Sequence, residues 1–136
     1  MQYFVVIDTN VIVSALLSKH SDAATVRVLD ALYESKIIPL YNDEILKEYQ
    51  EVLKRKKFNF SEKIIQLVIQ SIQSNGIIVE RLDTGENLPD PKDLVFYEVC
   101  MAKRKENSML VTGNMKHFPV KPFIITPNDL LDIIQN

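Results

Sequence analysis

The chain has few of the residues that define several protein classes. Its 136 residues include one cysteine, Cys100, three glycines and six prolines. An internal disulfide is therefore excluded, and a disordered or low-complexity chain is not expected. No apolar run approaches the ~20 residues that span a bilayer, and the start of the chain does not resemble a signal peptide. These absences predict a cytoplasmic protein with no membrane contact and with Cys100 as a reduced core residue.

A basic excess is also missing. The formal net charge is −2 and the pI is about 5.7, whereas most nucleic-acid-binding proteins carry an excess of Lys and Arg. Positive charge is nevertheless clustered, in Lys54-Arg55-Lys56-Lys57, in residues 103–105, and around Lys116, His117 and Lys121. Each cluster is either a solvated group at a helix end or a contact for phosphate, and the net charge does not distinguish the two.

Short apolar runs alternate with amphipathic helical patterns along the whole chain. We expect strands at 3–7, 37–40, 77–79, 109–112 and 123–125, and helices at 11–17, from 21, from 43, at 62–75, at 93–104 and from 127. Strands that alternate with helices imply right-handed crossovers and a parallel sheet covered on both faces. The sequence therefore predicts an α/β fold with one domain over 1–136, a three-layer α/β/α sandwich around a mainly parallel sheet of about five strands.

Asp8 directly follows the first apolar run, Phe4-Val5-Val6-Ile7. In parallel α/β sheets, ligands bind beyond the carboxyl ends of the strands, and a charge beside a buried strand is costly unless something pairs with it. A metal ion would supply that partner. Alternatively, Asp8 or Thr9 caps the helix that begins near Val11, and this stretch alone leaves both interpretations open.

Other carboxylates accompany later element boundaries. Glu48 borders the apolar stripe of the helix from 43, so we expect it to be half-buried. Asp90 and Asp93 flank the start of the helix at 93, where one acid suffices for capping and for the helix dipole. Crowded carboxylates repel one another unless a cation offsets the charge, and oxygen ligands favour Mg²⁺ or Mn²⁺ over zinc.

Polar groups also follow the fourth strand. Thr112 and Asn114 come directly after the apolar run of that strand, with Gly113 between them allowing a tight turn. We expect their side chains at the same edge of the sheet as Asp8.

Taken together, these stretches resemble a PIN domain over essentially the whole chain. The similarity rests on Asp-Thr-Asn at 8–10, Glu48 in Ile-Leu-Lys-Glu-Tyr-Gln-Glu-Val-Leu, Asp-Pro-Lys-Asp at 90–93, and Leu-Val-Thr-Gly-Asn at 110–114 with its His-Phe-Pro tail. Each motif is weak alone, but four in order at predicted boundaries are specific. The variant with Thr-Gly-Asn and His-Phe-Pro resembles one branch of the family.

The resemblance implies a role for each matching residue. Asp8, Glu48 and Asp93 would be the catalytic, metal-binding acids, and Asp90 would be an accessory metal ligand. Thr9, Asn10 and Thr112 would support them. Many family members have Asp where this chain has Asn114, whose amide oxygen can bind a metal but adds no charge. We therefore expect one well-occupied metal site and a weaker second site.

The resemblance also implies an activity and partners. PIN domains are metal-dependent nucleases that act mostly on RNA, and many small prokaryotic members are toxins of toxin–antitoxin pairs. We expect a Mg²⁺- or Mn²⁺-dependent endoribonuclease for single-stranded RNA, with an antitoxin protein as a partner and a homodimer as an option. Lys54, Arg55, Lys116 and His117 would contact RNA, although His117 also suits a surface or capping position. Tyr41, Phe58 and Phe60 either stack on bases or, by default, pack in the core or at an interface.

Three other interpretations compete with a nuclease. A phosphatase that forms an aspartyl-phosphate at Asp8 usually needs a second Asp two residues on, where this chain has Asn10. A non-catalytic RNA-binding or protein-interaction module is the main alternative, and Asn114 favours it. The third is purely structural, with every acid acting as a cap or a solvated side chain.

Overall fold

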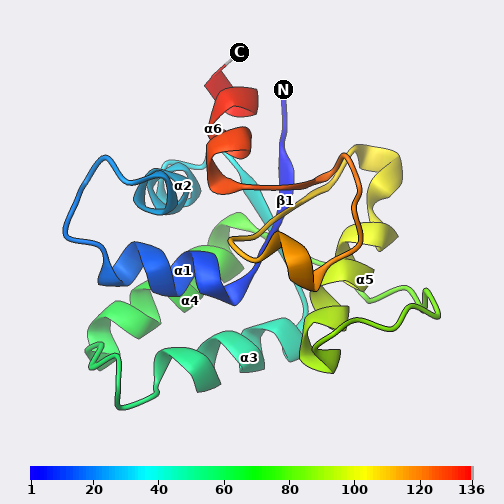
Figure 1. Ribbon diagram of the computed structural model, residues 1–136. Helices are drawn as coiled ribbons and strands as arrows, with labels where there is room; N and C mark the ends of the chain where they lie inside the picture. Colours follow the sequence, from blue (N-terminus) through cyan, green and yellow to red (C-terminus); the bar gives the residue numbers. More distant parts are fainter. Residues whose placement is uncertain (136) are drawn as a thin grey trace.

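The computed structural model describes residues 1–135, which contain a five-stranded sheet in the order β3-β2-β1-β4-β5 (Figure 1). Every neighbouring pair of strands is parallel. The strands are β1 (Phe4–Ile7), β2 (Ile38–Tyr41), β3 (Ile77–Ile78), β4 (Met109–Val111) and β5 (Ile124–Ile125). The predicted parallel α/β sheet is therefore confirmed.

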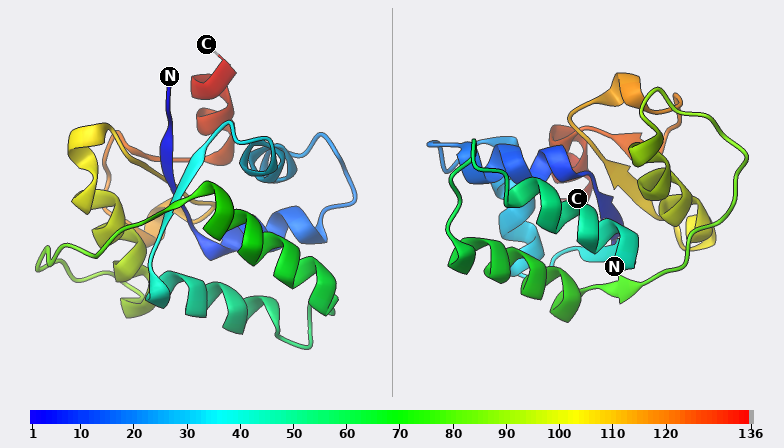
Figure 2. Two further views of the ribbon diagram at one scale, coloured as in Figure 1. Left: turned by 180° about the vertical axis from the view of Figure 1, so that it is seen from behind. Right: turned by 90° about the horizontal axis from the view of Figure 1, so that it is seen from below.

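Helices flank this sheet on both sides and complete the three-layer α/β/α fold (Figure 2). Helix α5 packs on β1, β2 and β4, whereas α2 packs against α1, α4 and α6. The helices are α1 (Thr9–Leu17), α2 (Ala24–Tyr33), α3 (Asp43–Leu53), α4 (Glu62–Asn75), α5 (Leu94–Ala102) and α6 (Pro127–Gln135), with 3₁₀ turns η1 (Pro91–Asp93), η2 (Arg104–Glu106) and η3 (Met115–His117). Within residues 1–135, no helix has both the length and the apolar character that crossing a membrane requires.

Local chemistry explains why the elements form where they do. The side chain of Asn42 accepts a hydrogen bond from the Ile45 amide at 2.9 Å, and Ser61 accepts one from Ile64 at 3.2 Å, so both residues cap their helices as their types predict. The strands β1 and β4 are almost wholly buried, as expected for the centre of a parallel sheet. Cys100 is buried in this core, and burial raises the pKa of its thiol to about 11, so it is not a reactive thiolate.

The structure differs from the predicted pattern in a few places. Strand β3 lies at the edge of the sheet, so Ile77 and Ile78 are exposed rather than buried. On α4 the apolar stripe is wider than the face that packs, which leaves Ile64 and Leu67 exposed. Helix α2 begins at Ala24 rather than 21, after a turn. These differences arise because tertiary packing selects which apolar side chains are covered.

The carboxyl ends of β1 and β4 lie side by side. Ile7 is paired with Val111, and the next amide, that of Asp8, donates to the Val111 carbonyl at 3.0 Å. Two segments separated by about a hundred residues therefore deliver their first polar side chains, Asp8 and Thr112, to the same point.

Candidate functional site

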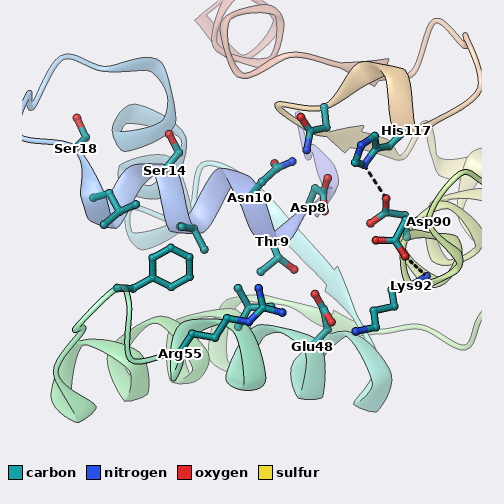
Figure 3. A pocket seen from close by; sticks show the side chains of 16 residues that line it. Asp8, Thr9, Asn10, Ser14, Ser18, Glu48, Arg55, Asp90, Lys92 and His117 are labelled. Carbon is teal, nitrogen blue, oxygen red and sulfur yellow. Dashed lines mark hydrogen bonds and ion pairs between the residues drawn. The ribbon is translucent and has the colours of Figure 1, made fainter.

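A cavity of about 730 Å³ opens at this edge of the sheet (Figure 3). Its walls come from α1 along its length, from α3 and the segment that follows it, from the segment around η1, and from the turn and η3 after β4. The lining residues are Asp8, Thr9, Asn10, Val13, Ser14, Leu17, Ser18, Glu48, Val52, Arg55, Phe58, Asp90, Lys92, Asp93, Asn114 and His117. Four carboxylates from three separate stretches of sequence thus face one space.

Asp8 occupies the N-cap position of α1, but its side chain makes no capping hydrogen bond. Instead its Oδ2 accepts from the Thr112 hydroxyl at 2.7 Å, and Thr112 Oγ1 in turn accepts from the Asn114 amide at 2.9 Å. The carboxylate is therefore oriented from behind by β4. The interpretation of Asp8 as a simple helix cap does not describe this geometry.

The charge on Asp8 is costly in its surroundings. The residue is only 5% exposed. Burial raises the pKa of its carboxyl to about 6 although the Thr112 hydroxyl lowers it, and nearby Asp93 raises it further. A cation at this position would relieve both the burial and the repulsion.

The two acids of the Asp-Pro-Lys-Asp segment have different roles. Asp90 Oδ1 accepts from the Lys92 amide at 3.0 Å, so this side chain caps η1. Asp93 precedes α5 without capping it. Its Oδ2 lies 3.1 Å from His117 Nδ1, which links η1 to η3.

Asp93 and Glu48 also show the effect of crowding. Burial and the neighbouring Asp90 raise the pKa of Asp93, against the lowering effect of His117. Burial raises the pKa of Glu48, which is half-buried as predicted, while Lys92 and Arg55 lower it. Among the acids, Asp93 interacts with both Asp8 and Glu48, and Lys92 is the positive charge that acts most strongly on Glu48.

Asn10 supports the turn after β4. Its Oδ1 accepts from the Gly113 amide at 3.1 Å. A Cβ added at Gly113 would meet this same oxygen at 3.6 Å, which is ordinary contact. The amide side chain of Asn10 therefore ties the first turn of α1 to the segment that carries Asn114.

The structure brings most of the predicted site residues together. Asp8, Thr9, Asn10, Glu48, Asp90, Asp93, Asn114, Arg55 and His117 all line the cavity. Thr112 lies directly behind Asp8. Of the four predicted RNA contacts, Arg55 and His117 line the cavity, whereas Lys54 and Lys116 are exposed outside it.

Some neighbours of the site were missed at the sequence level. Glu98 is 3% exposed within the apolar helix α5, and Arg81 pairs with it at 2.7 Å. The sequence does contain a signal for Glu98, because a carboxylate inside the apolar pattern of a buried helix needs a partner for its charge. No sequence signal indicated Lys92 as the cation beside Glu48, nor the contact of His117 with Asp93.

A family model described as a PIN domain matches residues 4–116. The chain belongs to the PIN domain family. The match covers every carboxylate of the cavity as well as Asn114, and it ends one residue before His117. No curated protein matches the chain significantly. PIN domains are in general nucleases and typically use divalent metal ions. A divalent ion is therefore the ligand whose requirements the cavity has to meet.

The donor set of the PIN domain suits a hard divalent cation. Within residues 1–135, the Thr9 hydroxyl oxygen is buried without a hydrogen-bond partner beside Asp8, which is unusual for a polar atom. No group of three or more His, Cys, Asp or Glu side chains in this part of the chain converges closely enough to enclose an ion. Mg²⁺ commonly binds through one or two carboxylates and keeps several waters. The residues therefore fit a largely hydrated ion held at Asp8 and Asp93.

Proposed function

We propose that this PIN domain is a metal-dependent endoribonuclease that hydrolyses phosphodiester bonds of single-stranded RNA. One observation carries the proposal: Asp8, Glu48 and Asp93 come from distant parts of the chain and line one cavity at the carboxyl edge of a parallel sheet. Burial raises the pKa of all three carboxyls and repulsion between carboxylates raises it further, so their ionised forms are costly without a cation.

The chain's own residues would hold and orient the reactants. Asp8, oriented by Thr112, and Asp93, oriented by His117, would hold Mg²⁺ or Mn²⁺ together with the other oxygen donors of the cavity, Glu48, Asp90 and Asn114. When bound, the ion lowers the pKa of water to supply the nucleophile and neutralises charge on the phosphoryl group. Lys92 and Arg55 line the same cavity and offer positive charge to the RNA backbone. No carboxylate has to form a covalent intermediate.

Purified protein tests this proposal directly. We expect cleavage of unstructured RNA in Mg²⁺ or Mn²⁺ that is lost in EDTA and falls at least ~100-fold in Asp8→Asn and Asp93→Asn, because each change removes charge at the ion. Asp22→Asn is the matched control, since Asp22 is exposed and outside the cavity. Folded protein that cuts no RNA in either metal would contradict the proposal.

A non-catalytic module is the second candidate, and two observations favour it. Asn114 supplies no charge where many family members have an acid, and no three acids of residues 1–135 converge as ligands. This alternative predicts RNA binding that persists in EDTA and is unchanged in Asp93→Asn, with no cleavage under any metal condition.

The proposal extends to the toxin of a type II toxin–antitoxin pair, acting in the cytoplasm. It is supported by the family, many small prokaryotic members of which are toxins. Exposed apolar side chains on α4, Ile64 and Leu67, offer a surface for an antitoxin protein or for a homodimer. Expression alone should slow growth, and co-expression of the adjacent gene's product should restore it. Growth that is unaffected by the active protein would contradict the toxin role.

A further inference from the structure

The cavity extends well beyond its carboxylates. A divalent ion with six waters takes up about 200 Å³, at ~30 Å³ per water, whereas the cavity measures about 730 Å³. Besides its polar groups, the cavity is lined by four apolar side chains, Val13, Leu17, Val52 and Phe58. We call this part of the cavity the apolar slot.

Helices α1 and α3 form the two walls of this space. Thr9, Val13 and Leu17 repeat every four residues on α1, and residues at that spacing share one helix face. Glu48 and Val52 have the same spacing on α3, which packs against α1, and Arg55 follows two residues after the end of α3. Leu17 lies about 13 Å along the helix from Asp8, at ~1.5 Å per residue. Apolar side chains therefore enter the lining on both walls beyond Thr9 and Glu48, on α1 together with Ser14 and Ser18.

Phe58 gives the slot an aromatic surface that is held in place. Its ring stacks on Phe60 with centroids 5.5 Å apart and 14° between the planes. Phe60 is not part of the lining, so it supports Phe58 from outside the cavity. The ammonium of Lys57 lies 5.1 Å from the centre of the Phe58 ring. Aromatic surface and positive charge thus occur at the same end of the cavity.

Positive charge accompanies the apolar side chains as well as the carboxylates. Lys54, Arg55, Lys56 and Lys57 are all exposed, and of these four Arg55 lines the cavity while Lys57 lies over the Phe58 ring. Ser14 and Ser18 line the α1 wall, where Figure 3 shows them on the side away from His117. A ligand that fits must be flat and apolar in part, must carry hydrogen-bonding edges, and must be negative beside Arg55.

We propose that the apolar slot binds one unpaired nucleobase of the RNA strand, with the phosphate next to that base at Arg55. The proposal rests on the proposed function, because the strand that enters the slot is the one held at the carboxylates. Stacking on aromatic side chains accepts every base. Phe58 is accordingly a residue that binds RNA. Its slot accepts only an unpaired base, at a fixed distance from the phosphate that is cleaved. Duplex RNA, whose bases are paired, is therefore excluded as a substrate.

The test measures binding, without any need for cleavage. Fluorescence anisotropy in EDTA compares an eight-nucleotide RNA with a series in which one base at a time is removed. Wild-type protein should lose about 5- to 150-fold in affinity at one position of the series. Phe58→Leu should bind the intact RNA about as weakly as the wild type binds that abasic RNA, and should be indifferent to the missing base. Phe123→Leu is the control, because Phe123 packs against Arg104 away from the cavity.

Arg55 provides a second, independent measurement. Arg55→Gln should reduce the slope of log affinity against log salt concentration by about 0.7, the value for one contact with single-stranded phosphate. Lys36→Gln, which alters an exposed residue paired with Glu34, should leave the slope unchanged.

The outcomes separate the slot from the nuclease proposal. Base-dependent binding through Phe58 in a protein that cuts no RNA supports the slot and contradicts the nuclease. If the protein cleaves RNA but removal of a base weakens binding equally in wild type and Phe58→Leu, the slot proposal is overturned and the nuclease proposal stands. Absence of any RNA binding also overturns the slot proposal. So does a change of oligomeric state in Phe58→Leu when RNA affinity does not depend on the missing base, since the slot would then be a contact between protein chains.

Discussion

Asp8, Asp90 and Asp93 are the same residue type, but their surroundings give them different properties. Asp90 caps η1 and has a local partner for its charge. Asp8 and Asp93 leave their helices uncapped by side chains and instead receive one hydrogen bond each from a distant residue, Thr112 or His117. Because burial still raises the pKa of both carboxyls, their ionised forms lower the stability of the metal-free protein.

We predict that Asp8→Asn stabilises the protein in metal-free buffer at pH 7. The pKa of Asp8 rises from 3.8 to about 6 on folding, which at 1.36 kcal/mol per unit corresponds to at most about 3 kcal/mol. The Asn oxygen can still accept from Thr112. Urea denaturation in EDTA measures the change, with Asp22→Asn as the control. A large loss of stability would show that Asp8 has a structural role.

The raised pKa of Asp8 also predicts how the stability of the metal-free protein changes with pH. The folded protein keeps a proton on Asp8 that the unfolded chain releases near its ordinary pKa of 3.8. The stability of the metal-free protein should therefore carry a component that is lost as pH rises from about 4 to about 6. Asp8→Asn should lack this component. Parallel pH profiles of the two proteins would contradict the assigned shift.

At the level of elements, the segment between β3 and η1 is held by a buried carboxylate. Glu98 on α5 receives hydrogen bonds from Arg81 at 2.7 Å and from the amide and hydroxyl of Thr84 at 2.7 and 2.9 Å. Arg81 also reaches Glu44 on α3 at 2.7 Å. These contacts join α3 to α5, the elements that carry Glu48 and follow Asp93.

We predict that Arg81→Met destabilises the protein by about 2–3 kcal/mol. The change leaves a buried Glu98 without its cation, and the value is discounted from 3–5 kcal/mol because Arg81 is partly exposed. Lys36→Met is the matched control, since the pair of Lys36 with Glu34 is exposed and should contribute at most about 0.5 kcal/mol. Equal effects of the two changes, measured by urea denaturation, would contradict this role of Glu98.

The Arg81→Met effect should depend on pH in a defined direction. Although burial alone raises the pKa of Glu98, the bonds from Thr84 and Arg81 lower it below its ordinary 4.5. The stabilisation is therefore present above that value and is lost as pH falls through the folded pKa. The difference between wild type and Arg81→Met should shrink under those acidic conditions.

For the whole molecule, ion binding and folding are linked because the unfolded chain has no assembled site. With a dissociation constant near 1 mM, 10 mM Mg²⁺ would stabilise the wild type by about 1.4 kcal/mol. For a domain of this size, that corresponds to an increase in Tm of about 3–5 °C. Asp8→Asn and Asp93→Asn should show no increase. A thermal melt in which all three proteins respond equally would place the ion elsewhere.

Much of the fold followed from local pattern. The strands and helices lie close to their predicted ranges because apolar periodicity and caps such as Asn42 and Ser61 act within a few residues. The half-burial of Glu48 was likewise visible from its place beside the apolar stripe of α3. The exposure of β3 was not visible in the sequence, because its short run Ile77-Ile78 is as apolar as the runs of the central strands.

The sequence by itself determined which elements form and which polar side chains end them. Tertiary structure alone decided that Thr112 holds Asp8 and that His117 rather than a cap partner contacts Asp93. The reason is physical: these contacts join residues up to about a hundred positions apart. They depend on the strand order that places β4 beside β1, which local periodicity does not encode.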